Sequence, residues 1–334
     1  MFKMILLVQL KLIETYVHIK EINYLIFPML STKIHLSSMK NKTIVITGAN
    51  SGLGYWTTLA LAEKGARIFM LCRSLEKGEQ VRQEFISRTR NSAIEIIPAE
   101  LSEKASIVEA AKTILSKTKK IDILINNAAL VSSKHTLTND NIELTFAVNH
   151  LGPFYLTHLL FPLLLNSEDG RIINISSNNH RRGKIHFNNL NLSSTYNILK
   201  AYNQSKLANV LFSYELHKLI QLKNLKNLSV YCIDPGHNNT PIGLKTNNKL
   251  HYFIWLLRSK MGKSPKKGAE CQVYAASEEK IKHISGQYWK NSKPTSPSPK
   301  SYDEHDAKKL WEISLKLCGI DEFFYTELYM NLTN

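Results

Sequence analysis

Two tyrosine–lysine pairs with the same spacing lie close together in the chain: Tyr196 with Lys200, and Tyr202 with Lys206. On a helix, residues four positions apart share a face, so each lysine ammonium can lie near its tyrosine phenol. A nearby positive charge favours the phenolate and lowers the pKa of the phenol, which suits a general acid and base for an alcohol–carbonyl pair. The spacing alone is weak evidence, because most such pairs on helices only pack or face solvent.

The sequence around each pair distinguishes them. Residues 207–212, Leu-Ala-Asn-Val-Leu-Phe, continue from Lys206 as an apolar helix that would pack on a sheet. Tyr196 instead lies in a loop-like approach to the same helix, which we predict over residues 198–219. We therefore predict that Tyr202 and its lysine are the catalytic pair, and that the earlier pair is not catalytic.

A glycine-rich turn follows a short apolar run at residues 44–46 and precedes a helical pattern over residues 55–64. Gly48 and Gly52 permit a tight turn and a close approach of the backbone to a pyrophosphate, and Gly54 lets the helix pack on the strand. The helix N-terminus adds free N–H groups and a partial positive charge for the phosphates. We therefore predict a dinucleotide site, against the alternative of an ordinary glycine-rich turn, although the G-x-x-x-G-x-G spacing differs from G-x-G-x-x-G.

The end of the second predicted strand, residues 67–72, bears on which dinucleotide binds. In dinucleotide-binding folds an Asp or Glu at this position hydrogen-bonds the 2′-hydroxyl of the adenosine ribose and selects NAD. Here Cys72 is followed by Arg73. A guanidinium suits a 2′-phosphate, so NADP is favoured over NAD; the alternative is an arginine on a solvated loop.

Strand and helix patterns alternate from residue 43 to about residue 235. Predicted strands at 44–46, 67–72, 93–97, 121–125, 171–175 and 228–233 are separated by predicted helices at 55–64, 75–88, 102–116, 139–165, with a bend at Gly152-Pro153, and 198–219. This order predicts a single α/β domain with a doubly wound, Rossmann-type parallel sheet and helices on both faces. Polar residues follow the strand ends at Asn126, Ser177 and Pro235-Gly236, where such folds bind ligands.

These motifs together resemble the short-chain dehydrogenase/reductase family over about residues 40–320. The shared motifs, in the family's order, are Thr47-Gly48-(x3)-Gly52-Leu53-Gly54, Asn126-Asn127-Ala128, Asn149, Ser177, Tyr202-(x3)-Lys206 and Pro235-Gly236. Three segments, residues 146–157, 171–177 and 201–216, resemble the retinol dehydrogenase subgroup and the oxidoreductase domain of WW-domain-containing oxidoreductases. The resemblance implies the same fold and an NAD(P)-dependent alcohol–carbonyl chemistry.

The resemblance also implies roles for individual residues. Tyr202 would transfer the proton, and Lys206 would lower the pKa of that phenol and hold the nicotinamide ribose. Ser177, with Ser176 as its competitor, would hydrogen-bond the substrate oxygen, and Asn149 would position the lysine through a water relay. Cofactor contacts would come from Gly48, Asn50, Ser51, Gly52, Leu53, Gly54, Arg73, Glu100, Leu101, Asn126, Ala128, Tyr202, Lys206, Pro235, Gly236 and Thr240. No metal site is expected.

Three residues depart from the family's pattern. Ala129 replaces the glycine after Asn-Asn-Ala, and Glu100 stands where an aspartate usually contacts adenine. His237 stands where an apolar residue usually follows Pro235-Gly236. These departures bear on cofactor affinity and leave the chemistry in place.

The expected substrate side of the chain is apolar. Residues 250–257, Leu-His-Tyr-Phe-Ile-Trp-Leu-Leu, are flanked by basic residues. An apolar pocket with a basic rim suits a lipophilic alcohol or aldehyde that is delivered from a membrane surface; an ordinary buried helix is the equal alternative. We expect residues 180–195 to form the pocket rim, with Ile185 and Phe187 pointing inward.

The composition limits the classes of partner that the chain is expected to bind. Lys and Arg number 43 against 27 Asp and Glu, a net charge of +16 that suggests an anionic partner. The lysines are scattered and no nucleic-acid-binding module is visible, so we expect a solvated basic surface, with an acidic membrane surface as the alternative partner and no nucleic acid. The cysteines have no metal or redox spacing, which predicts buried thiols in a reducing compartment: Cys72, Cys232, Cys271 and Cys318.

The chain divides into three predicted regions: an N-terminal extension at 1–39, the dehydrogenase/reductase domain at 40–320 and a tail at 321–334. Within the domain we expect a proline-rich surface loop at residues 293–299 and a last helix over residues 305–317. The longest uncharged run of the extension, residues 22–32, is shorter than the ~20 residues that a spanning helix needs. We therefore expect an intracellular protein, cytoplasmic or peripheral on the endoplasmic reticulum membrane; pairing into a homo-oligomer stays open.

The expected function is that of an NADP-dependent oxidoreductase that interconverts a lipophilic, retinol-like alcohol and its aldehyde or ketone. The alternative is a cofactor-binding scaffold of the same fold with little turnover. Because Tyr202 and Lys206 are both present, the sequence favours the enzyme.

Overall fold

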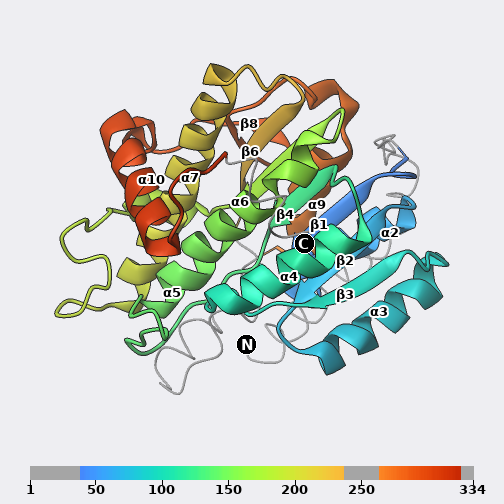
Figure 1. The fold of residues 1–334 in the computed structure, drawn as a ribbon, viewed down its shortest axis with the longest axis horizontal. Helices are drawn as coiled ribbons and strands as arrows, with labels where there is room; N and C mark the ends of the chain where they lie inside the picture. Colours follow the sequence, from blue (N-terminus) through green and yellow to red (C-terminus); the bar gives the residue numbers. More distant parts are fainter. Residues whose placement is uncertain (1–37, 237–262, 325–334) are drawn as a thin grey trace, which may run out of the picture. The chain divides into compact units, whose positions relative to one another are not determined.

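The computed structural model describes residues 38–236 and 263–324. Their core is an eight-stranded sheet with the strand order β3-β2-β1-β4-β5-β6-β7-β8 (Figure 1). All pairings are parallel except that of the last strand, which is antiparallel to β7. The strands are β1 (Thr43–Thr47), β2 (Arg67–Cys72), β3 (Ile94–Pro98), β4 (Ile123–Asn126), β5 (Gly170–Ile175), β6 (Leu228–Asp234), β7 (Gln287–Lys290) and β8 (Lys293–Pro294).

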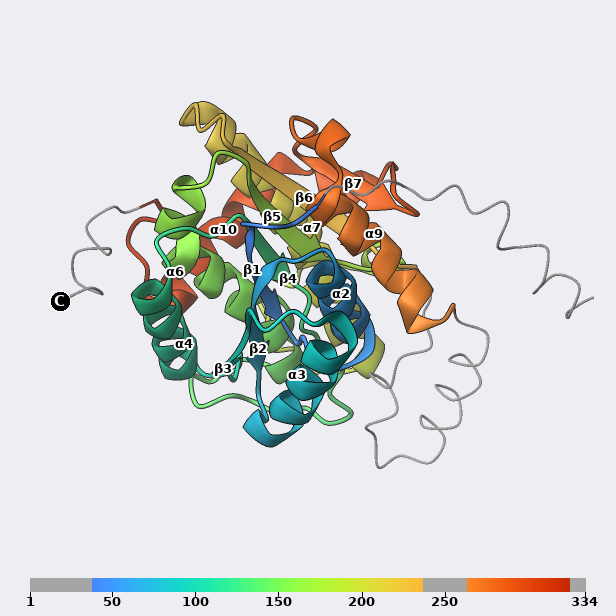
Figure 2. The same ribbon diagram turned by 90° about the vertical axis from the view of Figure 1, so that its right-hand side faces the viewer.

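Helices cover both faces of the sheet. The main ones are α2 (Gly52–Glu63), α3 (Leu75–Thr89), α4 (Lys104–Lys117), α6 (Gly152–Leu165), α7 (Ile198–Leu222), α9 (Pro265–Ser277) and α10 (Glu304–Cys318). One face carries α2, α3 and α9, and the other carries α4, α6 and α7 (Figure 2). The central strands are buried along their whole length, because helices cover them from both sides. The predicted doubly wound α/β fold is confirmed.

The sequence patterns did not predict the elements that the C-terminal part of the chain adds to the fold. Neither α9 nor β7 was predicted, and the proline-rich segment at 293–299 contributes Lys293–Pro294 to the sheet as β8. β7 is only four residues long, too short for its alternation to stand out.

The predicted helix over 139–165 is not continuous. Glu143 ends the preceding loop, and its carboxylate accepts hydrogen bonds from the backbone N–H groups of Thr145 and Phe146, so a short helix, α5 (Leu144–Phe146), starts there. A π-helical turn over Ala147–Leu151 then leads into α6. Pro153 lies at the start of α6 and has no N–H to continue a regular hydrogen-bond ladder, which accounts for the wider turn before it.

The last described residues cover the outer side of α6 and α7. Trp311 of α10 and Phe323 pack on Phe154 of α6, with ring centroids 5.1 Å from it in each case. His158 of α6 also bonds the Phe323 carbonyl at 2.7 Å. Phe323 is buried, so the packed core continues into the region that we predicted as a tail.

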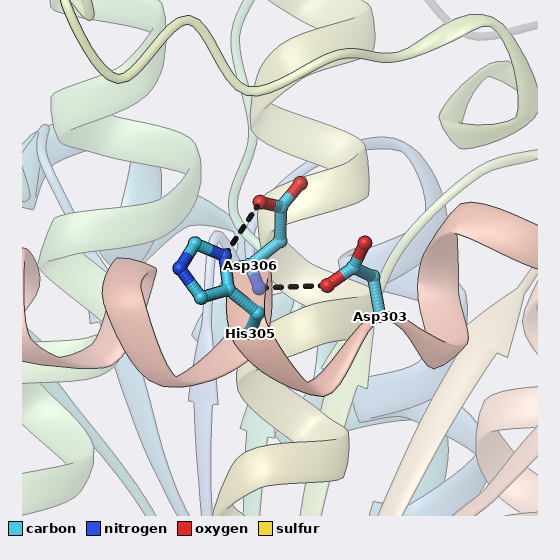
Figure 3. A group of neighbouring side chains, drawn as sticks. All are labelled: Asp303, His305 and Asp306. Carbon is cyan, nitrogen blue, oxygen red and sulfur yellow. Dashed lines mark hydrogen bonds and ion pairs between the residues drawn. The ribbon is translucent and has the colours of Figure 1, made fainter.

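α10 begins with a small group of polar side chains, shown in Figure 3. Asp303, His305 and Asp306 form the only three-residue group in the described part of the chain whose acidic and histidine ligand atoms all lie within 4.8 Å of one another. Asp303 already caps the helix, because its carboxylate accepts the Asp306 N–H at 2.9 Å. Helix capping explains this exposed group, and we assign no metal to it.

Two further sequence expectations concern cysteines and membranes. All four cysteines are free and buried, as predicted. Within residues 38–236 and 263–324, no helix combines the length and the apolar character needed to cross a bilayer.

Candidate active site

A cavity of about 1240 Å³ opens at the carboxyl ends of the parallel strands. Most of the residues that the sequence singles out line it: Gly48, Asn50, Ser51, Gly52, Leu53, Arg73, Glu100, Leu101, Ala128, Ser177, Tyr202, Lys206, Pro235 and Gly236. Gly54, Asn126 and Asn149 lie behind its wall. Thr240, His237 and the apolar segment at 250–257 lie outside the described residues. The volume exceeds the ~300–1,000 Å³ of ordinary small-molecule pockets, so it has room for a dinucleotide and a substrate.

The glycine-rich turn forms one end of the cavity. Gly48 and Gly52 have positive φ values of 64° and 55°, which side-chain-bearing residues rarely adopt. A Cβ at Gly54 would lie 2.1 Å from the Gly48 carbonyl oxygen, so the start of α2 packs on the turn only with glycine there. Ser51, the N-cap of α2, makes no side-chain cap and the first turn carries no acid. These features fit the pyrophosphate of a dinucleotide, which the helix N-terminus would attract.

Asn127, which the sequence analysis did not select, fixes this turn. Its amide donates to the Thr47 carbonyl at 2.9 Å and to the Gly48 carbonyl at 3.4 Å. Gln272 of α9 in turn donates to the Asn127 side-chain oxygen at 3.4 Å. Asn126 points elsewhere: its buried amide bonds Thr157 and a neighbouring strand, so its side chain holds the sheet and does not line the cavity. Of the two asparagines at the end of β4, Asn126 thus stabilises the core and Asn127 fixes the glycine-rich turn at the cavity.

The adenosine end of the cavity is basic. Arg73 is 71% exposed and its guanidinium lies 3.7 Å from the Glu100 carboxylate. Glu100 also accepts hydrogen bonds from the backbone and hydroxyl of Ser102, at 3.1 and 2.8 Å, which hold its carboxylate in the turn after β3. Lys77 of α3, a second cation, lines the same wall, and the sequence analysis missed it. Its place in the first turn of α3, directly after the N-cap Ser74, was the available signal.

Tyr202, Ser177 and Lys206 line the same cavity, and the part that they form is called the predicted reacting end. Burial raises the pKa of Tyr202 to about 12, whereas a hydrogen bond with Ser177 acts to lower that pKa. Burial lowers the pKa of Lys206 to about 8. The lysine Nζ donates to the Ile175 carbonyl at 3.0 Å and lies 5.7 Å from the centre of the Tyr202 ring.

The expected lowering of the Tyr202 pKa by Lys206 is therefore not found in the free protein. Both groups are buried, and removal from water disfavours the charged form of each. Asp234, at the end of β6, raises the pKa of Tyr202 further, because its negative charge opposes formation of the phenolate.

The structure separates both pairs of competing candidates. Ser176 and Ser177 both line the cavity, but the Ser176 hydroxyl is already engaged, because it donates to the Lys206 carbonyl at 2.7 Å. Tyr196 donates to the Ser132 carbonyl at 2.7 Å, and Lys200 donates to a threonine hydroxyl at 2.8 Å, so these two do not interact as a pair. Neither of them lines the cavity.

Asn149 lies in the π-helical turn and is fully buried. Its side chain accepts from the Leu130 N–H at 2.8 Å and donates to the Leu130 carbonyl at 2.9 Å and to the Ser205 hydroxyl at 3.0 Å. Ser205 precedes Lys206 on α7, and Leu130 lines the cavity. Asn149 thus connects the loop after β4 to the helix that carries the tyrosine and lysine.

The predicted pocket rim at residues 180–195 differs from the structure. Ile185 is buried in the hydrophobic core, and Phe187 packs against that core beneath the Lys309 ammonium, 4.7 Å from the ring centre. Neither lines the cavity. The apolar side chains that line the cavity include Val131, Leu144 and Val148 instead.

Comparison with known proteins gives consistent matches. The family model described as short chain dehydrogenase matches residues 42–251. Human retinol dehydrogenase 11 is 36% identical over 87% of this chain and 91% of the relative. Retinol dehydrogenase 12 from Bos taurus is 39% identical over 84% of this chain and 87% of the relative. The solved structure of an uncharacterised protein from Mycobacterium Paratuberculosis is 31% identical, with a TM-score of 0.68, over 85% of this chain and 96% of that one.

Proposed function

Since the chain belongs to the short-chain dehydrogenase family, and so is an NAD(P)-dependent oxidoreductase of alcohol and carbonyl groups, we propose that it uses NADP to interconvert a lipophilic, retinol-like alcohol and its aldehyde or ketone. One observation carries this proposal. Tyr202, Ser177 and Lys206 line the same cavity as the glycine-rich turn, so proton transfer and cofactor binding share one site.

Each side chain at the reacting end has a chemical task in the proposed reaction. When bound, the nicotinamide exchanges a hydride with the substrate carbon. Tyr202 donates its hydroxyl proton to the carbonyl oxygen in reduction and takes it back in oxidation. Burial raises the pKa of this phenol, so Tyr202 carries the proton that it would donate in reduction. Ser177 donates a hydrogen bond to the same substrate oxygen and stabilises the charge that develops there.

Lys206 and Asn149 support this proton transfer. We propose that the Lys206 ammonium holds the nicotinamide ribose, and that a proton on Nζ favours the phenolate when Tyr202 has given up its own. Asn149 holds the loop after β4 and the Ser205 turn of α7, so it positions the lysine rather than reacting itself.

The preference for NADP rests on the basic adenosine end. Arg73 and Lys77 offer two cations to a 2′-phosphate, and no acid occupies position 73 to receive a free 2′-hydroxyl. Glu100 partly neutralises Arg73 but is itself held by Ser102, which leaves the guanidinium largely exposed to an incoming phosphate.

The substrate class rests on the apolar wall and on the relatives. Val131, Leu144 and Val148 line the same cavity as Tyr202 and Ser177. The similar proteins are named retinol dehydrogenases. An apolar alcohol or aldehyde could pack on these apolar side chains while its one oxygen forms hydrogen bonds with Tyr202 and Ser177.

The regional and cellular assignments stay proposals. We propose a dehydrogenase domain over residues 40–320, and a location in the cytoplasm or peripherally on the endoplasmic reticulum membrane. Four free, buried cysteines support a reducing compartment. Contact with an acidic membrane surface would suit the net charge of +16.

The first experiment mixes the purified full-length protein with NADPH, and separately with NADH, and follows absorbance with all-trans-retinal and a panel of lipophilic aldehydes and ketones. We expect turnover with NADPH and little with NADH. Tyr202→Phe should abolish turnover while cofactor affinity stays unchanged, and Tyr196→Phe is the matched control that should keep turnover. Tight cofactor binding with no turnover on any substrate would favour a scaffold.

A further inference from the structure

His180, three residues after Ser177, is fully buried and makes a hydrogen bond through each ring nitrogen. Its Nδ1 lies 2.7 Å from the Ser177 carbonyl oxygen, and its Nε2 accepts the backbone N–H of Ser298 at 3.0 Å. The first contact reaches a residue of the reacting end. The second reaches the proline-rich segment at 293–299, which the proposed chemistry does not use.

These two contacts together determine where the ring proton lies. A backbone N–H can only donate, so Nε2 must carry a lone pair toward Ser298. A carbonyl oxygen can only accept, so Nδ1 must carry the hydrogen toward Ser177. A neutral His180 with its proton on Nδ1 satisfies both contacts, and the opposite tautomer satisfies neither.

We propose that His180 is a positioning residue. Its Nδ1–H bond to the Ser177 carbonyl sets the Ser177 hydroxyl at the reacting end, and the Ser298 N–H holds the ring in the tautomer that this bond requires. The inference rests on the proposed function, because it assigns His180 a task only if Ser177 contacts substrate.

The orientation of Ser177 depends on this carbonyl. Ser177 is the N-cap of a short 3-10 helix, Asn178–Arg182, and its hydroxyl accepts the Asn179 N–H at 3.3 Å. The carbonyl of the same residue accepts both the backbone N–H of His180, at 3.0 Å, and the ring Nδ1–H. These two hydrogen bonds to the carbonyl fix the plane of the Ser177 peptide. The Ser177 side chain extends from this fixed backbone toward the cavity.

The proline-rich segment is held firmly enough to act as a support. The Arg181 guanidinium donates to the carbonyls of Ser296 and Pro297, at 2.5 and 3.3 Å. The Ser298 hydroxyl bonds that of Ser301 at 2.9 Å, and both serines are almost fully buried. Prolines on both sides of Ser298 restrict the backbone further. The segment therefore presents one N–H to His180 in a fixed place.

A third group encloses the ring without changing the tautomer. The Tyr288 hydroxyl of β7 lies 3.2 Å from Nδ1, and the two rings are 4.9 Å apart. Burial lowers the pKa of His180, and the charges of Arg181 and Lys290 add to this, while the hydrogen bond to the Ser177 carbonyl and the charge of Asp234 act in the opposite direction. The surroundings thus favour the neutral ring that the two hydrogen bonds need.

Two substitutions at His180 separate its contacts. In His180→Asn the amide nitrogen can take the place of Nδ1 and donate to the Ser177 carbonyl. In His180→Gln the longer side chain can accept from Ser298 but has a methylene where Nδ1 was. We expect kcat to stay within about threefold of wild type in His180→Asn and to fall about 10- to 100-fold in His180→Gln, with the NADPH dissociation constant unchanged in both.

The two outcomes distinguish a positioning role of His180 from a purely structural one. If His180 only fills the core, both variants should lower the melting temperature and leave kcat alone. That result, or an equal fall of kcat in both variants, would overturn the proposal.

A second pair of variants leaves His180 in place, in case its replacement prevents folding. Ser298→Pro removes the N–H donor, and the native φ of −73° suits proline. Ser298→Ala loses the same hydroxyl but keeps the N–H, which makes it the matched control. We expect a fall in kcat with proline and near wild-type kcat with alanine; equal kcat in the two would contradict the role given to Ser298.

The tautomer can be measured without any substrate. The ¹⁵N chemical shifts of the histidine ring, assigned by loss of the signal in His180→Asn, should show protonation at Nδ1 in the wild-type protein. Protonation at Nε2 would overturn the inference even if turnover is found. Absence of turnover in the wild type would instead count against the proposed function, so the two failures are distinguishable.

Discussion

Replacing Arg73 with alanine should change the selectivity between NADPH and NADH rather than the rate of the chemical step. Arg73 lines the cavity after β2, and β2 lies three strands away from β5, the strand that leads to Ser177. A hydrogen bond to a charged group contributes about 1.5–3 kcal/mol when well formed. Because Arg73 is 71% exposed, screening by solvent reduces this, and we expect a loss of ~1.4 kcal/mol.

That energy corresponds to about a tenfold weaker NADPH affinity, with NADH affinity unchanged. Lys77→Ala should cause a similar but smaller loss, because an ammonium contacts a phosphate as a single point charge. The measurement is the dissociation constant of each cofactor by titration calorimetry, together with kcat at saturating NADPH. Arg88→Ala is the matched control, since Arg88 is a surface arginine of α3 that pairs with Glu84 and does not line the cavity.

Two results would refute this reasoning. Equal weakening of NADPH and NADH would mean that Arg73 supports the shape of the cavity and not the 2′-phosphate. No change for either cofactor would mean that the guanidinium stays with Glu100 and contacts no phosphate.

The remaining predictions concern the glycine turn and acid stability. Gly54→Ala places a Cβ 2.1 Å from the Gly48 carbonyl oxygen and should weaken cofactor binding more than tenfold, whereas Gly78→Ala, with its closest approach at 3.4 Å, should leave the dissociation constant unchanged. An unchanged constant in Gly54→Ala would show that the turn can move away. Burial lowers the pKa of His150 to about 3. Between pH 6.5 and 3 the unfolded chain therefore binds a proton at His150 and the folded protein does not, so the free energy of unfolding decreases as the pH falls through this window. His150→Phe should therefore reduce the pH dependence of the unfolding free energy in this window by up to ~1.4 kcal/mol per pH unit, measured by urea titration at several pH values. Identical slopes in the wild type and His150→Phe would contradict the role given to His150.

Sequence reasoning succeeded where a pattern is long or chemically specific. The apolar strands buried on both faces predicted the fold, and the glycine-rich turn lies between β1 and the first turn of α2, as its spacing indicated. The choice of Tyr202 over Tyr196 stays a prediction from local context, since only the former precedes an apolar helical face. The structure adds that Tyr196 bonds a loop carbonyl instead of its lysine.

What the sequence did not predict depends on contacts between distant segments. Asn127 and Asn126 are neighbours in the chain, and only the tertiary structure shows which one faces the turn and which one faces the core. Similarly, the sequence places His180 only in a loop. The tertiary structure shows that Ser298, more than a hundred residues later, donates a hydrogen bond to its ring. The direction of the Tyr202 pKa shift depends on burial, which no short motif encodes.

The aromatic packing between Phe154 and the pair Trp311 and Phe323 has a consequence for biosynthesis. The covering helix, α10, begins roughly 80 residues after α7 ends. At about 5–20 residues per second, the ribosome leaves the outer side of α6 and α7 uncovered for several seconds after both helices have emerged. The nascent chain therefore presents a large apolar surface that chaperones are expected to hold. A transcript that ends before α10 would produce a protein that keeps this surface exposed permanently, with Tyr202 and Lys206 already synthesised but on an aggregation-prone chain.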